Sequence, residues 1–173
     1  MPIAARISQR IVEPHFEIQG KTSLSGELKV SGAKNSALVL MAASLLTEEQ
    51  LILKNIPDLT DIAGMSKILL NLGAQLDKYQ QQISLEAKGI HHVELPYELV
   101  HGLRASFFCI GPLLARLGKA KIPLPGGCEI GARPVAEHIK GLKALGAYIT
   151  VEHGVVSASV KGIAKRLKGA DVI

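Results

Sequence analysis

The sequence predicts an α+β fold in which a β-α-β-α-β-β unit occurs twice, and three observations support this prediction. Apolar stretches of helical length alternate with shorter stretches of strand length. The tripeptide Leu-Gly-Ala stands at residues 72–74 and again at 145–147, each time at the end of an expected helix. Each copy is followed by two expected strands and then by Lys-Gly-Ile, so the order of elements matches as well as the tripeptide.

The first unit covers residues 34–90, and its elements follow from local sequence signals. We expect a buried helix at 34–46 (KNSALVLMAASLL), a strand at 51–56, a helix at 61–72 and a hairpin at 74–87. Ser31 and Gly32 are small residues suited to the start of the first helix. Gly73 is the residue type that most often ends a helix, which places the end of the second one.

The second unit covers residues 97–163 and repeats this order about 73 residues further along the chain. Pro96 is well placed to open a helix at about residues 97–117. A strand at 119–124, a loop, a helix that ends at Gly146 and a hairpin follow. One unit alone has a helical face and a sheet face to cover, so we expect the two copies to pack around shared helices.

Composition indicates a globular protein and argues against nucleic-acid-binding, membrane, secreted and disulfide-rich proteins. Of the 173 residues 47% are hydrophobic, enough for one domain or two small ones. The net charge of +5 suits a small anionic ligand, whereas 3% aromatic residues and no Trp offer nucleic acid few stacking surfaces. The apolar runs fall short of the roughly 20 residues that span a bilayer, and no secretion signal opens the chain. Two cysteines make no disulfide framework. We therefore expect a cytoplasmic protein with reduced thiols that binds neither nucleic acid nor membrane.

Residues 122–138 (IPLPGGCEIGARPVAEH) hold the strongest candidate for chemistry. Cys128 follows two glycines, which permit close approaches, and precedes Arg133 by five residues. A nearby guanidinium favours the thiolate and a buried apolar setting favours the thiol, so the loop leaves the protonation state of Cys128 open. An exposed cysteine in an ordinary turn is an equally good interpretation of the loop alone. Cys109, inside an apolar run, is expected to be a core residue.

Several polar side chains are candidates for binding an anion. Lys34 and Asn35 begin the first expected helix, where unpaired N–H groups and the positive end of the helix dipole attract anions. A lysine there opposes helix stability, which strengthens the case for a functional role, although an exposed, solvated lysine is the commoner explanation. Arg104 could grip a phosphate or carboxylate, or simply extend from a buried helix to solvent. Arg133 has the better case, because Pro134 fixes the chain after it.

The sequence indicates no metal, organic cofactor or common catalytic motif. His91 and His92 are adjacent and would point to opposite faces of a strand, and His138 lacks a partner at metal-ligand spacing. We therefore interpret the six histidines as surface or structural residues. SGAKN is not a Walker loop, and no GxGxxG, CxxC or nucleophile-elbow motif occurs.

Four stretches together resemble the UDP-N-acetylglucosamine 1-carboxyvinyltransferase family of enolpyruvyl transferases: SGAKNSAL, NIPDLTDI, PYELVHGLRASFFCIGPLLARLG and LPGGCEIGARPV. The resemblance runs from about Phe16 to the C-terminus. It implies an inverse α/β barrel of two similar domains, each made of three copies of the repeated unit. Residues 1–33 would then be a strand segment that belongs in part to the other domain. Residues 34–173 would be an incomplete domain with its two units at 34–90 and 97–163.

The resemblance implies transfer of the enolpyruvyl group of phosphoenolpyruvate to the 3'-hydroxyl of UDP-N-acetylglucosamine, with release of phosphate, at the start of peptidoglycan synthesis. Cys128 matches the family's general acid, which protonates the methylene carbon of phosphoenolpyruvate and also forms a covalent adduct with it. Lys34 matches a lysine that contacts phosphoenolpyruvate. The implied substrate-binding positions are Lys34, Asn35, Arg104, Arg133, Pro134, Val135 and Glu137. The resemblance implies no cofactor.

The sequence departs from the family pattern at a few positions. Ala136 and Glu137 stand where the family often has Asp-Leu against the uridine, and Phe108 stands where many members have Trp. The family's aspartate base and its opposing domain would lie beyond Ile173, so we expect this chain not to complete the reaction alone. Two alternatives remain. One is the shikimate-pathway enolpyruvyl transferase, which lacks this cysteine loop. The other is a noncatalytic remnant that binds a sugar nucleotide or a partner protein.

Overall fold

The computed structural model describes residues 15, 17–21, 23–125, 135–162 and 166–172. The chain divides into two compact units, Met1–Val30 and Ser31–Ile173. In the first unit the described residues belong to no helix or strand. The strand segment expected at residues 1–33, and its place in a second domain, therefore stay predictions.

The first block, residues 34–90, forms two helices and a three-stranded antiparallel sheet. Its elements are α1 (Lys34–Ala43), the 3-10 turn η1 (Ser44–Leu46), β1 (Leu51–Leu53), α2 (Thr60–Leu72), β2 (Gln75–Tyr79) and β3 (Gln82–Glu86). The strand order is β1-β3-β2, and Leu85 of the central strand lies opposite Leu51 and Leu76. α2 ends at Gly73, whose φ of 100° is left-handed, as its sequence predicts.

The second block, residues 97–163, repeats this topology. Its elements are α3 (Tyr97–Val100), the 3-10 helix η2 (Arg104–Cys109), α4 (Ile110–Leu117), β4 (Lys119–Pro123), α5 (Ala136–Ala144), β5 (Ala147–Glu152) and β6 (Val155–Val160). The strand order is β4-β6-β5, and Ala158 of the central strand lies opposite Ala120 and Ile149. In both blocks the last strand is therefore central and antiparallel to its neighbours. The predicted repeat is confirmed for its α-β-α-β-β part, and among the described residues neither block opens with a strand before its first helix, α1 or α3.

The prediction of a single helix at residues 97–117 is wrong. The chain instead forms α3, a turn at residues 101–103, and then η2 and α4. Leu103 has the extended dihedrals φ −133° and ψ 97°, which interrupt the helix. Gly102 stands beside this break, and glycine is a poor helix former because it loses more backbone freedom than other residues. The break matters for function, because residues 101–105 line the cavity described below.

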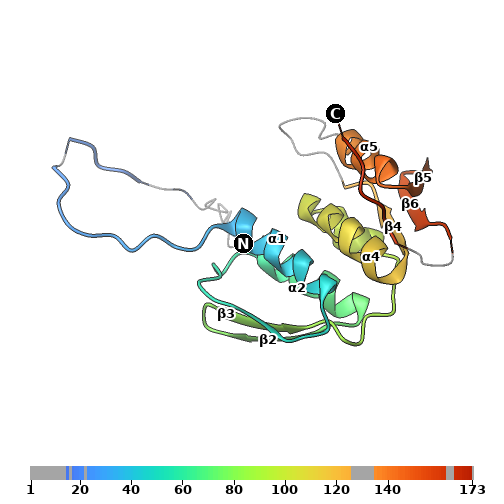
Figure 1. Ribbon diagram of the computed structural model, residues 1–173. Coiled ribbons are helices and arrows are strands. Elements are labelled where there is room, and N and C mark those ends of the chain that lie inside the picture. The colour runs from blue at the N-terminus through green and yellow to red at the C-terminus, as the bar shows by residue number, and fades with distance from the viewer. Residues whose placement is uncertain (1–14, 16, 22, 126–134, 163–165, 173) are drawn as a thin grey trace, which may run out of the picture. The chain divides into compact units, whose positions relative to one another are not determined.

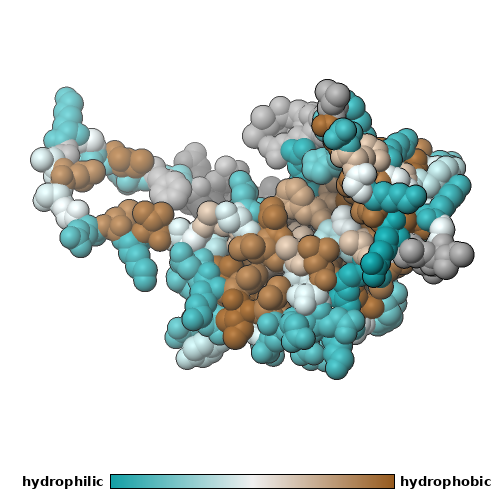
Figure 2. All heavy atoms as spheres, viewed as in Figure 1, coloured by the Kyte–Doolittle hydropathy of each residue, from teal (hydrophilic) through white to brown (hydrophobic). Residues whose placement is uncertain are grey.

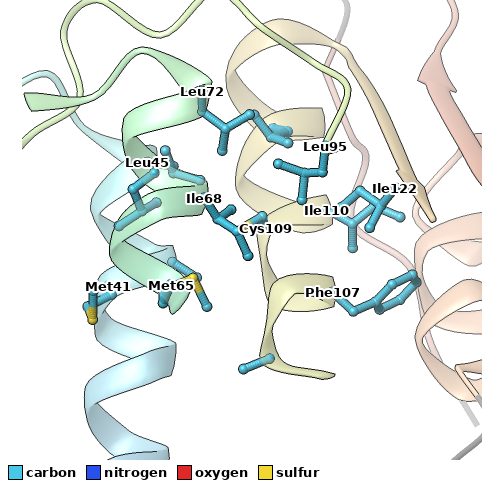
Figure 3. Close-up of a cluster of buried hydrophobic side chains, with 14 of the residues drawn as sticks. Met41, Leu45, Met65, Ile68, Leu72, Leu95, Phe107, Cys109, Ile110 and Ile122 are labelled. Carbon is cyan, nitrogen blue, oxygen red and sulfur yellow. The ribbon is translucent and has the colours of Figure 1, made fainter. Parts of the chain in front are cut away.

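Helices α1, α2 and α4 lie between the two sheets, which are on the outside (Figure 1). Figure 3 shows side chains from α1, α2 and the η2–α4 segment turned toward one another in this layer. Met41, Met65, Ile68 and Cys109 are all fully buried there. Burying a large aliphatic side chain stabilises a fold by about 1.5–3 kcal/mol, so this helical layer is the main stabilising core. The core position predicted for Cys109 is confirmed.

Part of the helical layer stays exposed. Val39, Leu40, Leu46 and Leu70 are 46%, 50%, 55% and 49% exposed. Figure 2 shows hydrophobic side chains gathered at the surface over the helices in the centre of the view. Exposed apolar faces of this kind are typical of surfaces that pack against another element or another chain.

Candidate active site

A cavity of about 680 Å³ lies between the two blocks. Its walls come from four places in the chain: the first two turns of α1, the first turn of α2, the segment His101–Phe108 and the start of α5. A volume in this range is typical of sites for small molecules. The cavity is therefore built by packing one block against the other, and neither block forms it alone.

Several residues predicted from the sequence meet at this cavity. The predicted residues that line it are Lys34, Asn35, Arg104 and Val135. Glu137 is exposed in the first turn of α5 and is not among the lining residues, so its contact with a ligand stays a prediction. The predicted residues that lie outside the described part of the chain are Cys128, Arg133 and Pro134.

The start of α1 borders the cavity, and its first backbone N–H groups lie before the first hydrogen bond of the helix. The first hydrogen bond of the helix runs from the Ala37 N–H to the Ala33 carbonyl at 3.0 Å, so the N–H groups before it have no partner within α1. No side chain caps this end, and no acidic residue occupies the first turn. Gly32 fixes the approach, because a Cβ there would lie 1.7 Å from the Asn55 carbonyl oxygen. Such an uncapped helix start attracts anions.

Two cations and one carboxylate set the charge of the cavity. Lys34 Nζ lies 2.6 Å from Asp61 Oδ2, and this ion pair joins the first turns of α1 and α2. Arg104 is exposed and makes no hydrogen bond or ion pair within the described ranges. The formal charge of these three side chains is positive, which suits an anionic ligand.

Two histidines and two phenylalanines at the cavity were not identified as site residues by the sequence. The His138 ring meets Phe107 edge-on, with centroids 5.7 Å apart, and lies 6.4 Å from the Phe108 centroid. The Tyr97 hydroxyl lies 3.2 Å from Nδ1 of His101, which also lines the cavity. For His138 a signal did exist: it follows Val135 by three residues at the start of a helix, and residues at that spacing share a face.

The chemistry available to the described residues is recognition rather than nucleophilic attack. Burial raises the pKa of the Cys109 thiol to about 12, so this thiol stays protonated and sealed in the core. Within the described ranges, no three His, Cys, Asp or Glu side chains gather closely enough to hold a metal ion. What the cavity offers is two cations, free backbone donors and aromatic rings, a combination suited to an anion that carries a planar or sugar group.

The family profile of EPSP synthase (3-phosphoshikimate 1-carboxyvinyltransferase) matches residues 18–172. The chain belongs to this family. UDP-N-acetylglucosamine 1-carboxyvinyltransferase of Prochlorococcus marinus (strain MIT 9313) is 65% identical over 173 residues, which are 100% of this chain and 40% of that protein. The protein of the same name from Parasynechococcus marenigrum (strain WH8102) is 61% identical, with the same coverage of both chains. The chain thus spans about 40% of the length of these curated relatives.

Solved structures support the fold independently. The enolpyruvyl transferase NikO from Streptomyces tendae superimposes with a TM-score of 0.71 at 23% identity, covering 87% of this chain and 32% of NikO. EPSP synthase from Acinetobacter baumannii gives a TM-score of 0.58 at 16% identity, covering 80% and 33%. At these identities the likeness shows the enolpyruvyl transferase fold and nothing finer. The predicted α+β fold class of this family is confirmed.

Proposed function

We propose that this chain takes part in the transfer of the enolpyruvyl group from phosphoenolpyruvate to the 3'-hydroxyl of UDP-N-acetylglucosamine. The observation that carries the proposal is the cavity in which Lys34, Asn35 and Arg104 converge from two blocks. The names of the relatives at 61–65% identity support it as well. The likeness to EPSP synthase stands at 16% identity and so does not favour the shikimate alternative.

The proposed reaction proceeds by addition and elimination. The 3'-hydroxyl oxygen of the sugar forms a bond to C2 of phosphoenolpyruvate while C3 accepts a proton, which gives a tetrahedral intermediate. The bond from C2 to the phosphate oxygen then breaks, C3 loses a proton, and inorganic phosphate leaves. Cys128 is the proposed donor of the first proton, since a thiol can serve as a general acid. The proton of the attacking hydroxyl goes to a base, for which the family resemblance implies an aspartate.

The cavity residues serve binding and charge compensation in this proposal. The Lys34 ammonium and the free N–H groups of α1 contact the anionic groups of phosphoenolpyruvate, and Asn35 lies beside the sugar nucleotide. Arg104, together with Arg133, offsets negative charge on the substrates. In a site that excludes much of the water, such preorganised charges stabilise a transition state strongly. The uridine contacts are assigned to Pro134, Val135 and Glu137.

The proposed role belongs to peptidoglycan synthesis, with its consequences for cell shape, the cell cycle and division. Among the described residues no helix has the length and hydrophobicity needed to cross a bilayer. A cytoplasmic location stays a prediction from cysteine usage. No cofactor is part of the proposed reaction.

A chimera tests the proposal. Residues 1–173 replace the matching part of the Prochlorococcus marinus (strain MIT 9313) relative, and phosphate release is measured. We expect release only with both phosphoenolpyruvate and UDP-N-acetylglucosamine, loss of release in Cys128→Ala, and retention in Cys128→Asp, because a carboxylic acid can also donate a proton. Release with shikimate 3-phosphate in place of the sugar nucleotide would favour the sister enzyme. Binding of the sugar nucleotide without turnover would favour a noncatalytic remnant.

The second cysteine provides a matched control. Because the Cys109 thiol is buried and its pKa is raised to about 12, it should resist alkylation until the protein unfolds. Iodoacetamide should therefore inactivate the parent chimera through Cys128, and a Cys109→Ala variant should be inactivated at the same rate. Inactivation that persists in Cys128→Asp would assign the sensitive group to another residue.

A further inference from the structure

Two Lys–Asp ion pairs of equal length lie near the start of α2, and only one of them belongs to the cavity. Lys34 Nζ is 2.6 Å from Asp61 Oδ2, and Lys78 Nζ is 2.6 Å from Asp58 Oδ1. The Asp61 side chain is 32% exposed and lines the cavity. The Asp58 side chain is 90% exposed and is not among the lining residues. The two pairs therefore share geometry and differ in surroundings.

A carboxylate in a cavity that suits anions needs an explanation. Asp61 repels a negative ligand and neutralises part of the charge that Lys34 presents, so it weakens anion binding. Its own position is favourable, because it lies in the first turn of α2, at the positive end of that helix dipole. Lys34 is in the opposite situation, since a cation in the first turn of α1 is repelled by the dipole of α1. Without a partner, its long flexible side chain would move away from the start of α1.

We propose that Asp61 is a positioning residue that holds the Lys34 ammonium against the start of α1 for the reaction. This inference rests on the proposed function of the cavity. An ammonium group has three N–H donors, so one can remain on Asp61 while the other two face the ligand. Asp61 thus weakens the binding of the anion but fixes the position of the Lys34 charge, which the transition state needs. Residues held in productive geometry raise the rate of a reaction without tightening the binding of its ground state.

The kinetic test compares Asp61→Asn with Asp58→Asn in the chimera described above. In Asp61→Asn we expect kcat to fall about 10- to 100-fold, because a misplacement of about 1 Å can cost that much. The KM for phosphoenolpyruvate should stay the same or fall, since a negative charge has left the site. Asp58→Asn should retain the parent kcat and KM. Asp61→Glu keeps the charge and should recover part of kcat. An unchanged kcat in Asp61→Asn, or a raised KM as its main effect, would overturn the proposal.

A double-substitution cycle separates positioning from an independent role. Lys34→Met, Asp61→Asn and the double variant are compared with the parent. If Asp61 acts through Lys34, the double variant should be no slower than Lys34→Met alone, because the group that Asp61 positions is already gone. Losses that multiply in the double variant would show that Asp61 acts on its own and would contradict the proposal.

A readout without turnover keeps this inference separate from the proposed function. In the 173-residue chain, the 15N resonance of Lys34 Nζ should move in Asp61→Asn and stay in place in Asp58→Asn. The 15N resonance of Lys78 Nζ should move in Asp58→Asn and stay in place in Asp61→Asn. A chimera without phosphate release would refute the proposed function while this spectrum still tests the ion pair. A Lys34 resonance that ignores Asp61→Asn would overturn the positioning role even in an active enzyme.

Discussion

The two blocks share one sheet topology, yet they bury their second helices to very different extents. In α2 five residues are completely buried: Ile62, Met65, Ile68, Leu69 and Leu72. In α5, at the same place in the repeat, no residue is buried, and Ile139 and Leu142 only pack partly against the core. A duplicated fold can therefore use one copy of a helix for stability and the other to present side chains. α5 carries His138 to the cavity at its start.

The two blocks also contribute different kinds of side chain to the cavity. The first block contributes the Lys34–Asp61 ion pair, which lies at the starts of two well-packed helices. The second block contributes Arg104 and His138, from the 3-10 helix η2 and from the half-exposed α5. A rigid charge on one side thus faces more exposed groups on the other. Substitutions at equivalent positions of the two blocks test this difference directly.

The largest difference in the loss of unfolding free energy is expected between Leu69→Ala and Leu142→Ala. Leu69 is completely buried in α2, and Leu142 stands at the equivalent position of α5 with only partial burial. Removing a buried leucine side chain costs about 2–5 kcal/mol, because apolar contacts are lost and a cavity is left behind. A half-exposed leucine loses less transfer free energy, about 1–2 kcal/mol. Urea unfolding of the 173-residue chain measures the free energy lost in each variant. Equal losses would show that α5 is as well packed as α2.

The equivalent glycines give the next contrast. Gly73 directly follows α2 and Gly146 follows the last residue of α5 by two positions, and both have a left-handed φ, of 100° and 91°. Alanine at either position pays about 1–2 kcal/mol for that conformation. At Gly73 a Cβ would also lie 2.7 Å from the Gly89 carbonyl oxygen, whereas at Gly146 it meets nothing within 4 Å. Gly73→Ala should therefore destabilise the chain by about 1–3 kcal/mol more than Gly146→Ala. Urea unfolding of both variants measures this difference. A larger shift of the urea midpoint in Gly146→Ala than in Gly73→Ala would contradict this ranking.

These glycines also show what the sequence could predict. The helix ends at Gly73 and Gly146, and the two hairpins after them, depend on short-range backbone preferences, which are visible along the chain. The repeat then fixed the topology, because the same order of elements occurred twice. The break before Arg104 was missed, since a single Gly102 inside an apolar, helix-like run is a weak signal on its own.

The candidate site was only partly predictable for a different reason. Lys34 and Arg104 were identified because a cation at a helix start or in an apolar run conflicts with its local surroundings. Asp61 and His138 have no such conflict: an acidic residue in a first helical turn is favourable, and a lone histidine is usually structural. Their roles come from the packing of α1 on α2 and of α5 on Phe107, which depends on contacts between distant residues.

Arg116 joins the two blocks and provides a third test. It lies in the last turn of α4 in the second block, and its side chain donates to the carbonyls of Leu45 at 3.0 Å, Thr47 at 3.2 Å and Ala87 at 2.8 Å in the first. Arg116→Met should destabilise the chain by about 1–3 kcal/mol, because carbonyls in a partly buried place lose their donor. As a control, Glu48→Gln removes only the exposed carboxylate partner of Arg116 and should cost about 0–1 kcal/mol. Similar losses in both variants would assign the effect to the ion pair.

The smallest effect is expected where the blocks differ only at the surface. Lys78 of the first hairpin pairs with Asp58, while the equivalent position of the second hairpin is Val151. The hydrogen bond from Lys78 and then its charge lower the pKa of Asp58 below its ordinary value of 3.8. A carboxyl with a lowered pKa stabilises the folded state above that ordinary value, and the contribution disappears as the pH falls through the folded-state pKa. Because the Asp58 side chain is 90% exposed, added salt should screen most of this contribution.

Asp58→Asn should therefore leave the urea midpoint nearly unchanged near neutral pH in high salt. At low salt the parent should hold a small advantage over Asp58→Asn that vanishes on acidification below the ordinary pKa of the carboxyl. Urea titrations of the two proteins across this acidic range, at two salt concentrations, measure the difference. An advantage that grows on acidification would have the wrong sign for this ion pair. An advantage that is insensitive to salt would mean that Asp58 stabilises the first block through something other than the charge of Lys78.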